Sequence, residues 1–171
     1  MNNKEIHDEL ATIKGAIERL QWKISEEKKE TEEKDNSISK YFSEPETTVS
    51  ATGARLGIDN KPNKEEKKNI LYTAQRMDEV REFLGVPLTV LSWFRCEKLN
   101  NAVKGSKTSA HRVGMAVDVH STKMTAKEIY EKFKKSKLSF DQLIYYPKSN
   151  FVHFGFKLDK SKERKQAWIN K

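Results

Sequence analysis

The chain has 171 residues and a formal net charge of +8, with 36% hydrophobic and 34% charged residues. This length suits one compact domain with an appendage, and the high charged fraction predicts that part of the chain lies outside the core. No segment approaches the roughly 20 apolar residues that a membrane-spanning helix needs, so we expect no such helix. The single cysteine, Cys96, excludes an internal disulfide and a cysteine-rich zinc site.

The N-terminal stretch MNNKEIHDEL is polar and lacks the apolar region of a secretory signal, so we expect a product made in the cytoplasm. Residues 1–40 hold 8 Lys and Arg against 10 Asp and Glu, so the positive charge belongs to residues 41–171. Such a surface attracts polyanions, whether nucleic acid, anionic lipid or an anionic cell-wall polymer. Charge alone does not choose among them.

Apolar residues recur every three or four positions between residues 6 and 24, which is typical of a heptad seam. The a positions hold Leu10, Ile17 and Ile24, and the d positions hold Ile6, Ile13 and Leu20. Glu9 at g and Lys14 at the following e would form an attractive interhelical pair. We expect a helix that forms a homo-oligomer or docks on a partner protein. The alternative is an amphipathic helix packed on its own domain.

Residues 25–40 are nearly all charged or small polar residues, as in a solvated helix end that fades into a linker. This composition divides the chain into a coiled-coil or docking segment, 1–40, and a domain, 41–171. Within the domain, helical spacing predicts a helix over 64–83 that Gly85 closes, followed by a short helix over 99–103.

The rest of the domain alternates between β-rich runs and helical patterns. Strands are expected in VPLTVLSWFR, GMAVDVH, FDQLIYYP and NFVHFGFK, and a helix capped by Thr125 in TAKEIYEKFKKS. The C-terminal stretch LDKSKERKQAWINK is expected to form a basic amphipathic helix, with Trp168 and Ile169 packed on the domain. The predicted fold class is α+β, with a small, mainly antiparallel sheet flanked by helices.

The stretch SAHRVGMAVDVH, residues 109–120, carries two histidines and an aspartate. Alternate residues of a strand share a face, so Asp118 and His120 point to the same side, and His111 lies in the preceding loop. A zinc site with an open position takes three ligands from His, Asp or Glu, and His153 in the strand FVHFGF is a candidate third ligand. We therefore consider a metal site of His111, Asp118 and His153. The alternative is a set of hydrogen-bonded structural side chains.

The segment Ser109 to Asp118 fits the pattern S-x-H-x-x-G-x-A-x-D, the signature of zinc D-alanyl-D-alanine carboxypeptidase-like peptidoglycan peptidases. The stretches SATGARLGIDNKPN, VPLTVLSWFRCEKLNNAVKGSKTSAH, FDQLIYY and YYPKSNFVHFGF also resemble small phage and bacterial members of this group, in the family's order. The resemblance covers residues 41 to about 157. It implies the zinc fold shared by D-Ala-D-Ala carboxypeptidases and hedgehog proteins, with His111, Asp118 and His153 as ligands of Zn²⁺.

The resemblance also matches Arg95, in SWFRCEKLN, to an arginine of the family. A planar, always charged guanidinium suits a substrate carboxylate or a developing oxyanion. The alternative role of Arg95 is a structural ion pair with Glu97 or Asp118. Ser109 would orient the metal loop through its hydroxyl, or serve only as a local cap.

Metal-assisted amide hydrolysis also needs a general base. Better-known relatives place a Glu or Asp three residues before the last histidine, and this chain has Asn150 there. Asn150 would bind substrate or support the site. Asp141 in FDQLI is the first candidate for the base, with a strand-end cap as its alternative role. His120 is the second candidate, with a supporting or surface position as its alternative.

These patterns predict a zinc-dependent peptidoglycan peptidase, a carboxypeptidase or endopeptidase that hydrolyses stem-peptide or cross-bridge amides. We expect a phage-encoded endolysin or a virion-associated enzyme that acts on the bacterial cell wall, either released at lysis or carried in the virion. The rival is a non-catalytic, zinc-containing structural or wall-binding module assembled through its N-terminal helix. Nucleic acid is not an expected partner, because no recognised binding motif accompanies the basic charge.

Overall fold

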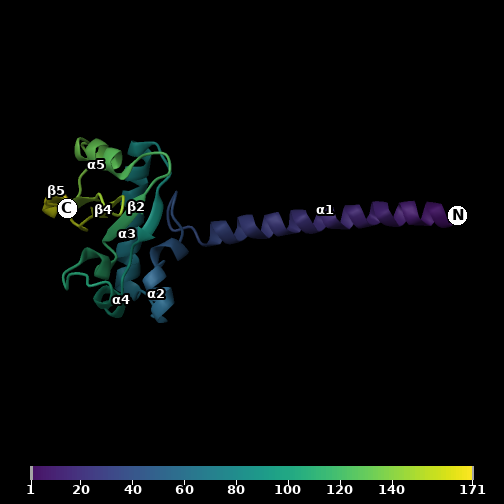
Figure 1. The fold of residues 1–171 in the computed structure, drawn as a ribbon, viewed down its shortest axis with the longest axis horizontal. Helices are drawn as coiled ribbons and strands as arrows, with labels where there is room; N and C mark the ends of the chain where they lie inside the picture. The colour runs from purple at the N-terminus through teal and green to yellow at the C-terminus, as the bar shows by residue number, and fades with distance from the viewer. Residues whose placement is uncertain (1, 171) are drawn as a thin grey trace. The chain divides into compact units, whose positions relative to one another are not determined.

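The computed structural model describes residues 2–170, and within the first helix the side chains at positions 5, 6, 9 and 30–35 are not described. The chain forms two compact units, Met1–Ser37 and Ile38–Lys171 (Figure 1). Among the helices of the described part, none is both long and apolar enough to cross a bilayer.

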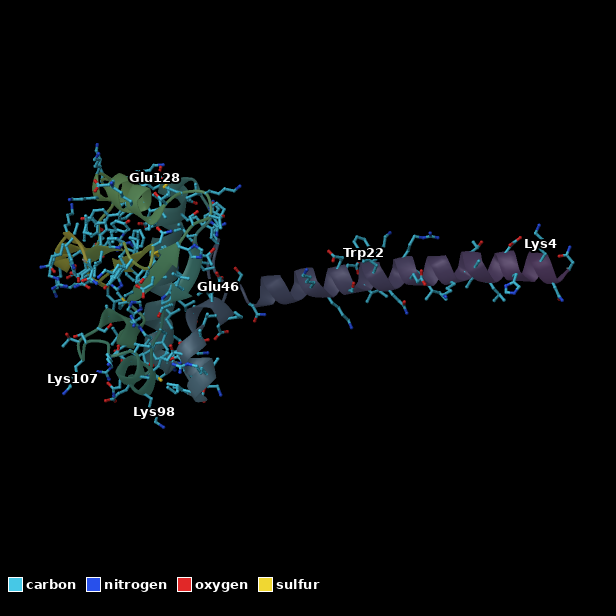
Figure 2. The ribbon with its side chains drawn as sticks, viewed as in Figure 1. Lys4, Trp22, Glu46, Lys98, Lys107 and Glu128 are labelled. Carbon is cyan, nitrogen blue, oxygen red and sulfur yellow. The ribbon has the colours of Figure 1, made fainter. Side chains whose placement is uncertain are left out.

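The first unit is helix α1 (Asn3–Asp35), drawn in purple in Figure 1. The predicted helix is confirmed, and it continues beyond the expected fade into a linker because Glu and Lys are good helix formers. Its described seam residues are between 48% and 60% exposed: Leu10, Ile13, Ile17, Leu20 and Ile24. Ile6 and Glu9, which were also placed in the seam, lie outside the described side chains. Side chains project all around the helix, Trp22 among them (Figure 2). The partner of the seam stays a prediction.

The second unit is built on a five-stranded sheet with the order β1-β2-β4-β3-β5. Its strands are β1 (Thr89–Ser92), β2 (Ala116–His120), β3 (Gln142–Tyr146), β4 (Phe151–Gly155) and β5 (Gln166–Ile169). All neighbouring strands are antiparallel except β3 and β5, which are parallel. The predicted α+β class with a mainly antiparallel sheet is confirmed.

The helices of this unit are α2 (Ala51–Leu56), α3 (Lys64–Leu84), α4 (Glu97–Ala102) and α5 (Ala126–Lys134), with short 3₁₀ turns η1 (Pro45–Thr47), η2 (Ala110–Val113) and η3 (Lys160–Lys162). Side-chain caps mark the starts of α2, α3 and α5, whereas α4 begins without one. Asn63 and Glu66 form a capping box at the start of α3, and Gly85 ends that helix with a φ of 74°. Thr125 and Glu128 form a second capping box at α5.

The two faces of the sheet have different tasks. One face packs into the hydrophobic core, together with α3 and α5. This face carries Val117, Val119, Leu143, Val152 and Phe154. Because side chains alternate along a strand, the other face carries Asp118, Ile144, Tyr146, Phe151 and His153. In the ladder Asp118 is paired with His153, and His153 is paired on its other side with Ile144. The register thus brings distant polar residues side by side.

The expected C-terminal helix is wrong. Residues 160–162 form only η3, and Gln166–Ile169 form strand β5 on the edge of β3. Without β5, the outer edge of β3 would have unpaired backbone N–H and C=O groups, and β5 pairs with them. Just before the two strands, the amide of Lys165 donates to the carbonyl of Phe140. Trp168 and Ile169, which were expected to pack on the domain from a helix, lie instead on this edge strand and are 39% and 45% exposed. The charge pattern of this segment predicted an amphipathic helix, but pairing with the open edge of β3 stabilises a strand instead.

Candidate metal centre

Three side chains from separate elements converge on one point of the sheet. His111 comes from η2, Asp118 from the middle of β2 and His153 from the middle of β4. His111 Nε2 lies 3.2 Å from Asp118 Oδ1 and 3.1 Å from His153 Nδ1, and His153 Nδ1 lies 2.8 Å from Asp118 Oδ1. All three residues are buried. The structure therefore brings together the three predicted ligands.

Gly114 shapes the loop that presents His111. It ends η2 with a φ of 75°, a conformation that L residues other than glycine rarely adopt. A Cβ atom at this position would lie 2.7 Å from Cγ1 of Ile70 and 3.1 Å from the carbonyl oxygen of Glu66, both on α3. The glycine of the motif therefore allows the loop to lie directly against α3, as well as allowing the turn itself.

The backbone of the neighbouring segment fixes the orientation of the His111 ring. The Nδ1–H of His111 donates to the carbonyl oxygen of Trp93 at 2.6 Å. Trp93 is itself fully buried, and its Nε1–H donates back to the carbonyl of Gly114 at 3.3 Å. With the proton on Nδ1, the lone pair of Nε2 points toward Asp118 and His153. Such a hydrogen bond is how proteins usually set the tautomer of a metal-binding histidine.

The protonation states also match those of metal ligands. Burial lowers the pKa of His111, so the imidazole is neutral at physiological pH. Burial would raise the pKa of Asp118, but the contacts with His111 and His153 outweigh it and hold this pKa far below its usual range. The centre therefore combines neutral imidazole with ionised carboxylate, which are the forms that bind a cation.

A cation accounts for this geometry better than hydrogen bonds alone. With its proton on Nδ1, His111 has only a lone pair on Nε2, which faces the anionic Asp118 oxygen at 3.2 Å. Two acceptors at this distance repel each other unless a proton or a metal cation lies between them. Tetrahedral bonds of roughly 2.0–2.2 Å place ligand atoms roughly 3.3–3.6 Å apart. The two distances from His111 Nε2, 3.2 and 3.1 Å, are close to this range, and the 2.8 Å between His153 Nδ1 and Asp118 Oδ1 is shorter. The donor set fits zinc with an open coordination position.

Arg95 lies beside this centre, on the segment that follows β1. Its Nη2 is 3.7 Å from Oδ2 of Asp118, and burial lowers its pKa. Of the two structural ion pairs considered for it, the one with Asp118 is present, whereas Glu97 pairs with Arg112 at 3.6 Å. Arg95 Nε is buried and has no hydrogen-bond partner among the described residues. The guanidinium thus faces the centre with hydrogen-bonding capacity to spare.

Asn60, which lies in the stretch SATGARLGIDNKPN and was not among the predicted site residues, holds the Arg95 segment in place. Its side-chain amide donates to the carbonyl of Phe94 at 2.9 Å, and its side-chain oxygen accepts from the amide of Cys96 at 2.8 Å. It also donates to the carbonyl of Thr48 at 3.1 Å. The buried side chain therefore fixes the backbone on both sides of Arg95. The stretch SATGARLGIDNKPN carried the family resemblance, but it gave no indication of this bridge.

Asp141 lies at the cleft but is held by cations. Arg164 donates to it from Nε at 2.8 Å and from Nη2 at 2.6 Å, and Lys157 Nζ lies 3.2 Å away. Burial would raise the pKa of Asp141, but the hydrogen bonds from Arg164 and the contact with Lys157 outweigh it and lower the pKa. This environment makes the carboxylate a weaker base than a free one. Its role as general base stays a prediction.

The other predicted site residues are distributed unevenly. Ser109 lines the cleft, but its side chain makes no capping hydrogen bond to η2. His120 is on the same face of β2 as Asp118 but pairs with Thr89 at the end of the strand, and it does not line the cleft. Asn150 is exposed in the turn between β3 and β4 with a φ of 50°. Asparagine is one of the few residues other than glycine that adopt this conformation readily.

The cleft above the centre has a volume of about 1220 Å³. Its lining is rich in positive charge: six cations, Arg95, Lys104, Lys107, Arg112, Lys157 and Arg164, stand against three carboxylates, Glu66, Asp118 and Asp141. Tyr146 and Phe151 add an aromatic wall. The sequence analysis missed most of these residues. Alternation along β3 could have found Tyr146, but the helix expected at the C-terminus hid Arg164.

Comparison with protein families matches the chain to the family described as Peptidase M15 over residues 40–155. No curated protein matches the sequence. The match covers more than half of the chain and includes β1 through β4 with all three candidate ligands. The segment 156–171, which contributes Lys157 and Arg164 to the cleft, lies outside it. The chain therefore belongs to the peptidase M15 family.

Proposed function

We propose that this protein is a zinc-dependent peptidase of the bacterial cell wall that hydrolyses amide bonds in peptidoglycan stem peptides or cross-bridges. The observation that carries the proposal is the buried convergence of His111, Asp118 and His153 at a cleft of a metallopeptidase family member. When bound there, zinc supplies a Lewis acid for the scissile carbonyl and lowers the pKa of water toward neutrality.

The residues around the centre supply binding and orientation. The Trp93 carbonyl holds His111 in the tautomer that leaves Nε2 free. Arg95 has its Nη2 3.7 Å from Asp118 and an Nε without a hydrogen-bond partner among the described residues, and it is placed to bind a substrate carboxylate or a developing oxyanion. Asn60 keeps that guanidinium in place through the backbone on both sides.

The charge of the cleft supports a peptidoglycan substrate. Stem peptides carry free carboxylates, and a cleft with twice as many cations as carboxylates attracts them. Lys104 and Lys107 on the loop after α4 and Lys157 after β4 provide this charge at different points of the lining. Whether the enzyme acts as a carboxypeptidase or an endopeptidase depends on which of these cations meets the substrate terminus.

One observation favours the rival, a non-catalytic zinc module. Each carboxylate that lines the cleft is already engaged: Asp118 at the metal centre, Asp141 by Arg164, and Glu66 in the capping box of α3. A general base must therefore come from Asp141 after it loosens its contact with Arg164. If Asp141 does not do so, the fold binds zinc without cleaving the wall.

The N-terminal helix supports assembly into something larger than one chain. Its exposed apolar seam is suited to a homo-oligomer or to docking on a partner protein. We propose that the helix attaches the peptidase to such an assembly, as an endolysin subunit or a virion component that opens the wall.

The test is hydrolysis of purified sacculi by the full chain, with mass spectrometry of the released muropeptides and a measurement of bound zinc. His111→Ala and Asp118→Asn should lose both zinc and hydrolysis. His120→Ala is the matched control, because it removes a histidine from the same strand as Asp118 but outside the cleft lining. Zinc binding by the wild type without any new muropeptide would replace this proposal with the non-catalytic module.

A further inference from the structure

Tyr146 lies on the same face of the sheet as the metal centre. It ends β3, where it is paired with Phe151, two positions from the pair of Ile144 and His153. Its side chain lines the cleft together with Arg95, Asp118 and His153. The alternation of β3 therefore aims this phenol at the cleft that holds the candidate ligands.

The ring of Tyr146 is held in place while its hydroxyl is free. It stacks on Phe151 with the ring centroids 4.4 Å apart and the planes 15° from parallel. Among the described residues, no hydrogen bond involves the Tyr146 hydroxyl, although the group is half-buried. A fixed ring with an unused O–H is a preorganised hydrogen-bond donor.

The surrounding charges keep this donor protonated. Burial raises the pKa of Tyr146, and Asp118 raises it further, while Arg95 acts in the opposite direction. The phenol therefore keeps its proton throughout the physiological range. It can donate a hydrogen bond to an oxygen that gains negative charge, without giving up the proton.

We propose that Tyr146 is a catalytic residue whose hydroxyl donates a hydrogen bond to the carbonyl oxygen of the scissile amide, alongside Arg95. The inference rests on the proposed peptidase function and names a residue that acts in it. No covalent bond to the phenol forms or breaks. The donor gains strength as the carbonyl oxygen becomes an oxyanion, so its contribution belongs mainly to the transition state.

The adjacent tyrosine provides a matched control. Tyr145 points to the opposite face of β3, where it packs against the core with its ring 6.1 Å from that of Tyr130. Tyr146→Phe and Tyr145→Phe each remove one hydroxyl from neighbouring positions of the same strand. Only the first removes it from the cleft, and the phenylalanine keeps the stack on Phe151.

The experiment measures kcat and KM on a defined muropeptide, bound zinc, and the affinity of a phosphinate peptide that mimics the tetrahedral transition state. For Tyr146→Phe we expect a kcat lower by on the order of 10²-fold and a similar loss of phosphinate affinity, as for removal of one oxyanion donor. KM and zinc content should stay near those of the wild type. Tyr145→Phe should leave kcat and phosphinate affinity unchanged.

The outcomes separate the two proposals. If the wild type hydrolyses the muropeptide and Tyr146→Phe retains kcat and phosphinate affinity within about twofold, the role of Tyr146 is overturned while the peptidase function stands. If Tyr146→Phe loses zinc together with activity, the residue supports the metal centre instead, and the inference is overturned as well. If the wild type hydrolyses nothing, the peptidase function fails and the inference fails with it.

Discussion

The segment outside the family match is tied to the domain by a buried ion pair, and breaking it should strongly destabilise the fold. Arg76 of α3 lies 2.9 Å from Glu163, and their side chains are 3% and 0% exposed. Arg76 also donates to the carbonyl of Ser139 at 2.6 Å. In Glu163→Ala, the guanidinium would stay buried without its main counter-charge.

The expected size follows from this burial. Removing one partner of a buried ion pair typically costs about 3–5 kcal/mol of unfolding free energy, because an uncompensated charge is left behind. The domain Ile38–Lys171 has an unfolding entropy of roughly 0.28 kcal/mol/K, at about 2.1 cal/mol/K per residue. Glu163→Ala should therefore lower the melting temperature by roughly 11–18 °C.

The assay is thermal unfolding of the full chain followed by circular dichroism, together with urea unfolding. Glu79→Ala is the matched control: Glu79 also pairs with Arg76, at 3.4 Å, but it is 43% exposed and should cost under about 1 kcal/mol. The double change Arg76→Met with Glu163→Leu removes both charges and should recover most of the stability. A loss below about 1 kcal/mol for Glu163→Ala would refute the reasoning, because the pair would then behave like an exposed one.

Two further predictions concern the cleft. Gly114→Ala should destabilise the domain by about 1–3 kcal/mol and weaken zinc binding in a calorimetric titration, because the new Cβ meets Ile70. Gly57→Ala is the control, since Gly57 also has a positive φ but lies in open space. It should leave the zinc affinity unchanged in the same titration. Asp141→Asn should lower the free energy of unfolding at pH 7, because the ionised Asp141 is stabilised in the folded state. In thermal melts at a series of pH values, the difference in melting temperature between wild type and variant should shrink as the pH falls below about 3.9 and vanish below the lowered pKa of Asp141. If Asp141 is the general base, Asp141→Asn should lower kcat strongly even at a temperature at which the variant is fully folded. An equal kcat in wild type and variant would show that Asp141 is not the general base.

Much of the fold was predictable because local patterns and the final structure agree. The alternation in AVDVH and FVHFG, and the capping residues Asn63 and Thr125, each point to the element that forms. The C-terminal segment was mispredicted because its four-residue strand is stabilised by pairing with β3, which no local pattern reveals. Strand propensity depends on such neighbours more than helix propensity does.

The candidate metal centre was predictable as a set of residues but not as a geometry. Spacing placed Asp118 and His153 on strands, but only the ladder shows that they are cross-strand partners. Asn60 and Arg164 escaped notice for the same reason, because their partners lie far away in the sequence. A single sequence names chemical groups, while register and packing decide which of them meet.

The central claim is that His111, Asp118 and His153 hold one zinc ion with a coordination position left open. X-ray absorption at the zinc edge, on the full chain with the metal content measured in parallel, tests it most directly. We expect one zinc per chain bound only by nitrogen and oxygen at about 2.0–2.2 Å, with binding lost in His111→Ala and kept in His120→Ala. A sulfur ligand at about 2.3 Å, which Cys96 as the single cysteine of the chain would have to supply, would contradict the account, and so would zinc retained by His111→Ala.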